Sequence, residues 1–115
     1  MLDIFRRLAL ELPEAAEGAH MGKPDFRVSG RIFATLGRPK EEWGMVALKP
    51  HEQELLVGAE PVMYRLVPGG WGKRGCTNVN LAEVDEVSLR SALLMAWRGK
   101  AAKRLAERHA ALVDA

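Results

Sequence analysis

A chain of 115 residues, 48% hydrophobic and 28% charged, has the size and composition of one globular domain spanning residues 1–115. The single cysteine excludes an internal disulfide, and no apolar run approaches the roughly 20 residues of a membrane span. The N-terminal residues do not have the pattern of a signal peptide, so we expect a cytoplasmic protein without a membrane partner. The net charge of +2 is uneven, because residues 58–115 hold nine Lys/Arg against six Asp/Glu.

The first half of the chain predicts a helix followed by three strands. Apolar residues recur at helical spacing from Ile4 to Leu12, with Asp3 as a candidate N-cap, and Pro13 favours an end there. The stretch 13–24 is interpreted as a turn of helix and a glycine-containing loop. Residues 25–37 then form two strand-like runs around Ser29-Gly30, a two-residue hairpin loop that would place Phe26 opposite Phe33. "WGMVALK" extends this meander by a third strand.

The second half predicts a short helix from Pro50, strands at "PVMYRLV" and "CTNVNL", and two helices at the end of the chain. Asp85 is a candidate N-cap of the first of these helices, whose apolar stripe includes Trp97 as a core residue. The order α-β-β-β-α-β-β-α-α predicts an α+β fold in two layers, with an antiparallel sheet of about five strands and helices on one face.

The stretch "PGGWGKRGCTNVNL" (68–81) holds four glycines, a tryptophan and two adjacent bases. Its GxGxxG match leads into a strand, whereas a dinucleotide-binding turn leads into a helix, so we exclude a Rossmann site. A Walker A loop also fails, because Arg74 follows Lys73 where a hydroxyl residue is needed. We interpret the stretch as a long hairpin connection whose basic tip is a candidate contact point.

No catalytic or metal-binding constellation emerges from the sequence, and we expect a protein that is not an enzyme and has no cofactor. His20, His51, His109 and Cys76 share no short ligand spacing. Cys76 begins a strand, where a cysteine more often packs as a small hydrophobic residue than acts as a nucleophile. Acidic residues cluster only in turns and helix starts, where they are favoured for local reasons.

Trp71 is the unusual tryptophan, since it lies between glycines and beside Lys73 and Arg74. An aromatic ring next to cations can stack on a nucleobase while the cations hold phosphate. The alternative is that Trp71 folds back and anchors the loop. Downstream, "WRGKAAKRLAER" (97–108) carries five bases and one acid, which fits either a phosphate-binding surface or a helix end whose dipole is compensated.

Three blocks carry a resemblance to a known family: H-x-G-x-P-x-F-R-V at 20–28, G-x-T-x-V-x-L at 75–81, and Ala96-Trp97-Arg98. Their order and spacing resemble the MmcQ/YjbR-like family of small bacterial proteins, over roughly residues 4–106. The resemblance implies an α+β fold like that of CyaY and secretion chaperones. It also implies no established enzymatic activity and a DNA-binding label that rests on two hairpin "wings".

Carried onto this chain, the wings are the Ser29-Gly30 hairpin and the 69–75 loop, with a basic C-terminal segment beside them. The predicted nucleic-acid-binding residues are Arg27, Arg31, Trp71, Lys73, Arg74, Arg98, Lys100, Lys103 and Arg104. The leading hypothesis is therefore a DNA-binding protein that is not an enzyme. The alternative is a protein-interaction or chaperone-like module that binds a partner or a second copy.

A third hypothesis is a small-molecule site between the sheet and the loops. Its candidate lining residues are His20, Lys23, Lys49 and Trp71. Alternatively, His20 and Lys23 only shape the entrance to the first hairpin.

Overall fold

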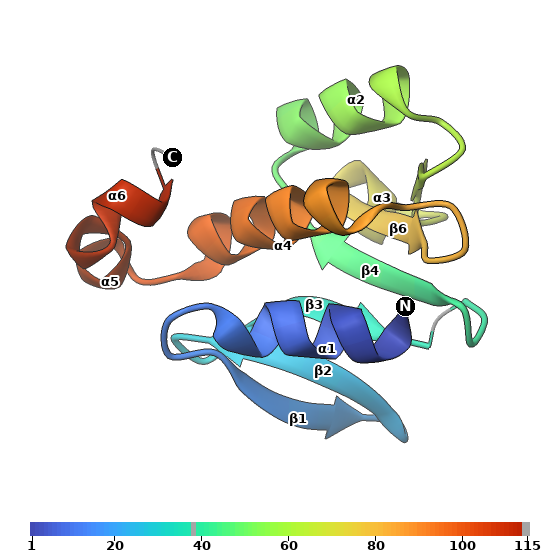
Figure 1. Ribbon diagram of the computed structural model, residues 1–115. Coiled ribbons are helices and arrows are strands. Elements are labelled where there is room, and N and C mark those ends of the chain that lie inside the picture. The colour runs from blue at the N-terminus through green and yellow to red at the C-terminus, as the bar shows by residue number, and fades with distance from the viewer. Residues whose placement is uncertain (38, 114–115) are drawn as a thin grey trace.

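A computed structural model, which describes residues 1–37 and 39–113, contains a six-stranded antiparallel sheet with helices packed on one face (Figure 1). The strand order is β1-β2-β3-β4-β6-β5. The strands are β1 (Ala16–His20), β2 (Lys23–Val28), β3 (Arg31–Leu36), β4 (Trp43–Ala47), β5 (Tyr64–Leu66) and β6 (Cys76–Asn80). The predicted two-layer α+β class is confirmed, with one strand more than expected.

The additional strand is β1, which pairs with β2 through a tight turn at Met21-Gly22. We predicted a helical turn and a loop here, and that prediction was wrong. The sequence "AEGAH" has no β-branched residue and only its central Gly18 is even partly buried, so the strand has no hydrophobic signature. Met21 and Gly22 both have positive φ, the conformation that a two-residue hairpin turn of this type requires.

The β2–β3 hairpin turns at Ser29-Gly30 as predicted, and again both residues have positive φ. Val28 lies opposite Arg31 and Arg27 opposite Ile32, but Phe26 lies opposite Ala34 and not Phe33. A bulge shifts the register by one residue. Because of it, Phe33 and Ala34 are both fully buried although they are consecutive.

The helices α1 (Leu2–Glu11) and α4 (Glu86–Lys100) cover one face of the sheet and enclose the core with it (Figure 1). Phe5 packs 5.9 Å from Phe26, ring centroid to ring centroid. Trp97 is fully buried, as predicted, and its indole N–H donates to the Pro13 carbonyl at 2.9 Å. The predicted N-cap of α4 at Asp85 is confirmed, because the Asp85 carboxylate accepts a hydrogen bond from the Ser88 amide at 2.7 Å. The predicted N-cap of α1 at Asp3 was wrong, because α1 begins at Leu2 with Met1 as its N-cap.

The connection between β5 and β6 folds as a hairpin around one helical turn, α3 (Gly70–Lys73). This turn is anchored from α2 (Pro50–Ala59), where buried Gln53 donates to the carbonyls of Gly72 and Cys76 at 2.9 and 3.0 Å. Gly72 is needed for space, because a Cβ at this position would lie 1.7 Å from the Val67 carbonyl oxygen. The loop is therefore a fixed structure that presents its tip in one orientation.

The segment after α4 forms two short helices, α5 (Lys103–Arg108) and α6 (Ala110–Val113), where one terminal helix was expected. The Ala102 amide donates to the Ser29 hydroxyl at 2.9 Å, which ties the start of α5 to the tip of the β2–β3 hairpin. None of the helices in the described part of the chain is both long and apolar enough to cross a membrane.

Candidate nucleic-acid interface

The face of the sheet turned away from α1 and α4, here called the outer face, carries polar and basic side chains. Alternation along β6 fixes which residues point there: Thr77 and Val79 are fully buried against the core, so Cys76 and Asn78 point outward. Paired residues share a face, which adds Met45 and Ala47 opposite them. The same reasoning places Lys23, Asp25 and Arg27 of β2 on the outer face, through the pair Asp25–Thr35.

A pocket of about 380 Å³ lies on the outer face. It falls within the roughly 300–1,000 Å³ typical of small-molecule sites. The lining residues come from β1, β2, β3, β4 and β6, from the connection after β5, from α3 and from the end of α4: His20, Lys23, Pro24, Ile32, Thr35, Met45, Ala47, Val67, Trp71, Cys76, Asn78 and Lys100. Three of the four residues in our small-molecule hypothesis are among them, and Lys49 is not. None of the described residues that line the pocket is acidic.

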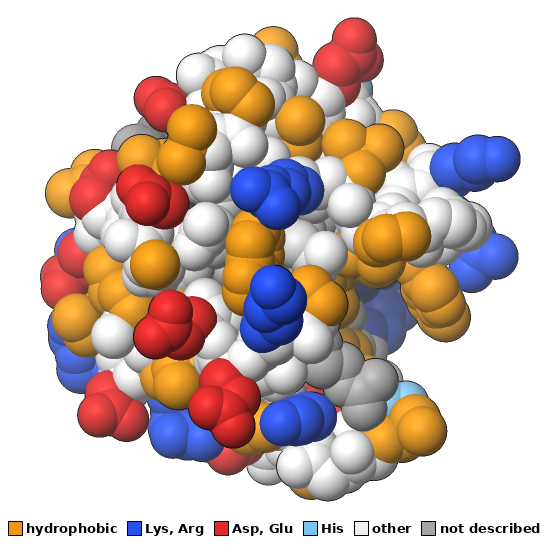
Figure 2. Space-filling model, turned by 90° about the vertical axis from the view of Figure 1, so that its right-hand side faces the viewer, with side chains coloured by type: hydrophobic (Ala, Val, Ile, Leu, Met, Phe, Trp, Pro, Cys, Tyr) orange, Lys and Arg blue, Asp and Glu red, His pale blue; other side chains and the backbone are white. Residues whose placement is uncertain are grey.

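Basic side chains gather around this pocket, and acids gather on the other side of the molecule. Figure 2 shows the hollow on its right-hand side with Lys and Arg side chains nearby, whereas most Asp and Glu side chains lie over the left-hand, helical side. Some acids there are held in ion pairs, such as Arg6–Glu17 at 2.9 Å and Arg7–Glu86 at 3.3 Å. The small net charge thus conceals a basic face.

Asp25 is the one acid on the outer face among the described residues of β2 to β4, and it is neutralised. Its two carboxylate oxygens accept from the Arg27 guanidinium at 2.9 and 3.0 Å, and the carboxyl is fully buried. This bond holds the pKa of Asp25 below its usual value and raises the pKa of Arg27. The pair leaves Arg27 half exposed and fixed in position.

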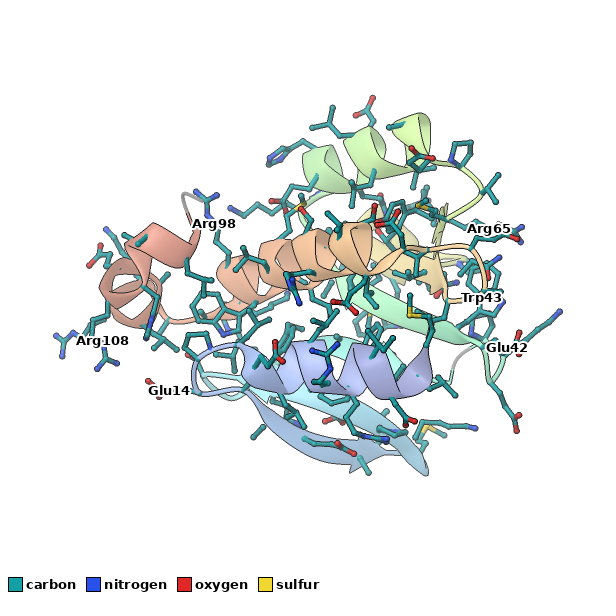
Figure 3. The ribbon with its side chains drawn as sticks, viewed as in Figure 1. Glu14, Glu42, Trp43, Arg65, Arg98 and Arg108 are labelled. Carbon is teal, nitrogen blue, oxygen red and sulfur yellow. The ribbon has the colours of Figure 1, made fainter. Side chains whose placement is uncertain are left out.

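Trp71 is exposed by 65% and forms part of the pocket wall. The Arg74 guanidinium lies 5.1 Å from the centre of its ring, so cation and aromatic surface are presented together. This exposure disagrees with the alternative that Trp71 folds back and anchors the loop, since most of its ring faces solvent. A similar pair, Arg65 over Trp43 at 5.0 Å, lies on the same face, because Arg65 pairs with Asn78 and Trp43 with Asn80 (Figure 3).

The structure brings some of the predicted site residues together and separates others. Trp71 and Lys100 line the pocket, Lys73 and Arg74 lie on or next to α3, and Arg27 lies on the outer face. Lys100 and Arg74 are both near enough to Cys76 to act on its pKa, although burial outweighs them and raises that pKa. The thiol is therefore poorly ionised, which argues against a nucleophile.

Four predicted residues lie elsewhere. Arg98 is exposed and lies two residues before Lys100 on α4, roughly 160° around the helix axis from it; Figure 3 shows it toward α6. Arg31 pairs with Val28 and so belongs to the opposite side of the β-ribbon from Arg27. Lys103 and Arg104 are exposed at the start of α5, next to the hairpin tip.

Sequence reasoning missed Asn78 as a pocket residue. The sequence did contain a signal for it, because the predicted strand "CTNVN" places Asn78 and Asn80 on one face and the β-branched Thr77 and Val79 on the other. It also missed that Arg65 would stack on Trp43, since that contact joins strands far apart in sequence. No group of three or more metal-ligating side chains occurs in residues 1–37 and 39–113.

Comparison with known proteins adds the family. The family model described as YjbR matches residues 10–99. The chain belongs to the YjbR family. This YjbR protein is similar in fold to the crystal structure of DR2400 from Deinococcus radiodurans, which has a DUF419 domain. The two chains are 19% identical in sequence and superpose with a TM-score of 0.73 over 94% of this chain and 86% of that chain. No curated protein matches the sequence.

Proposed function

We propose that this YjbR protein binds single-stranded nucleic acid across the outer face, through phosphate contacts and stacking on Trp71. The observation that carries the proposal is the pairing of an exposed aromatic ring with cations around a hollow that no described acid lines. Four of these cations, Lys23, Lys73, Arg74 and Lys100, form no ion pair with any described acid. They are free to neutralise phosphates.

A single strand fits better than a duplex because the site is hollow. Ring stacking and a pocket require bases that are not already stacked in a helix, and single strands supply them. Reading bases in a duplex would require an element that enters a groove, and the fixed turn of α3 is only four residues long. Arg98 and Arg31 are not needed for this mode of binding.

The test is a comparison of wild-type protein with the double variant Lys73→Glu/Arg74→Glu. A fluorescent single strand of about 15 nucleotides and the matching duplex are titrated at low salt, and binding is followed by fluorescence anisotropy. We expect tighter binding of the single strand by the wild type and a loss of about 100-fold in the variant, because two attractive charges become repulsive.

The control is Arg98→Glu/Arg104→Glu, which makes the same change in net charge away from the pocket. If both double variants lose affinity equally, net charge and not the outer face explains binding. If the wild type binds neither polymer at low salt, nucleic-acid binding is refuted and the protein-interaction hypothesis becomes the better one.

A further inference from the structure

The side chain of Asn78 lines the pocket and forms no hydrogen bond with another described residue. The residue is 8% exposed and lines the pocket. The hydrogen bonds within residues 1–37 and 39–113 include none to its side chain. A primary amide offers two donors and an acceptor. No buried side-chain nitrogen or oxygen among the described residues lacks a partner, so the amide of Asn78 is open to solvent through the pocket and available to a ligand. A pocket built this way favours a ligand with matching polar atoms.

The surroundings of Asn78 define the rest of that ligand. Met45 lies opposite it on β4, and Ile32, Ala47 and Val67 supply further apolar wall. A ring system with a polar edge satisfies both surfaces. Lys23 and Lys100 also line the pocket, so an anionic group attached to the ring would meet a cation.

We infer that the pocket is a subsite for one unstacked nucleobase of the bound strand, with Asn78 pairing to its hydrogen-bonding edge and Lys23 and Lys100 holding the adjoining phosphates. This inference rests on the proposed function and adds to it the place where a base is read. The four bases each present neighbouring donor and acceptor atoms on the edge that pairs in a duplex. A side-chain amide can turn over to match them, so the subsite requires a base without selecting one.

The first test compares a single strand of mixed sequence with a strand of equal length in which every base is missing. Wild-type protein should bind the normal strand at least about fivefold more tightly, the lower end of what one stacked base contributes. Asn78→Leu should reduce binding of the normal strand about tenfold and leave the baseless strand unaffected. Asn80→Leu is the control on the same strand, because Asn80 lies two residues along β6 and does not line the pocket. Its Oδ1 accepts from the Ala82 amide at 3.1 Å, so thermal melting must show that this variant is folded at the assay temperature.

The second test needs no variant, because Cys76 lines the same pocket and is the chain's one cysteine. The normal strand should slow the reaction of Cys76 with a maleimide at least about fivefold, while the baseless strand should protect it less. Equal binding and equal protection by both strands would overturn the base subsite and base stacking on Trp71, and would leave only the phosphate contacts of the proposed function. Failure of both strands to bind would overturn both, and an unaffected Asn78→Leu variant would remove Asn78 from the subsite.

Discussion

Lys100 and Arg98 offer the sharpest test of where nucleic acid binds. Both are basic, both lie in the last turn of α4, and both therefore interact alike with the helix dipole. Lys100 lines the pocket, and Arg98 does not. Replacing each by glutamine removes the same charge from two sides of one helix.

The size of the Lys100 effect follows from counterion release. One phosphate contact on a single strand contributes about −0.7 to the slope of log affinity against log salt, which makes its loss worth about eightfold at 50 mM salt and about fourfold at 150 mM. Eightfold corresponds to about 1.2 kcal/mol. Arg98→Gln should leave affinity within about 1.5-fold of wild type, since Arg98 is exposed, does not line the pocket and would contact no phosphate there.

The assay is fluorescence anisotropy of a labelled single strand at several salt concentrations, for both variants and the wild type. Thermal melting serves as the control for folding, and the two variants should melt within about 2 °C of each other. Equal losses of affinity in Lys100→Gln and Arg98→Gln would refute the placement of the interface on the outer face. An unchanged Lys100→Gln variant would remove Lys100 from it.

Three further predictions concern the scaffold. Gly75→Ala should destabilise the fold by about 2–5 kcal/mol in thermal melting, because φ at this position is +113° and the new Cβ would lie 1.9 Å from the Leu48 carbonyl oxygen. The control is Gly58→Ala in α2, whose new Cβ meets open space and should stabilise the fold slightly. The rate of Cys76 alkylation should still rise above about pH 10, where an unburied thiol has levelled off, because burial raises the pKa of Cys76. The pKa of Asp25 is lower in the folded protein than in the unfolded chain, where it is near 4, so the carboxylate stabilises the fold above about pH 4 and this stabilisation is lost as the pH falls further. The free energy of unfolding of Asp25→Asn should therefore depend less on pH below about pH 4 than that of the wild type.

The elements with strong periodicity were predictable, and those fixed by tertiary contacts were not. The apolar stripe of α4 and the Ser29-Gly30 turn were found from local pattern alone. β1 was missed because edge strands bury little and need little hydrophobic character. The bulge that buries Phe33 depends on packing across the sheet, which a hairpin rule does not contain.

The candidate site was half predictable for the same reason. Trp71 and Lys100 are prominent in a linear reading, as an aromatic between glycines and a base in a basic tract. Their meeting in one pocket required the sheet order and the fixed turn of α3. Conversely, the basic tract 97–108 is continuous in sequence, but the helical geometry of α4 places Arg98 on another side of the helix from Lys100 (Figure 3).

The measurement that tests the central claim most directly is the salt dependence of single-strand binding by the wild-type protein. With Lys23, Lys73, Arg74 and Lys100 each neutralising one phosphate, the slope of log affinity against log salt should be about −3, and affinity should fall about 50-fold between 50 and 200 mM. A slope near zero, or no binding at low salt, would contradict the claim that the outer face of this YjbR protein is a nucleic-acid interface.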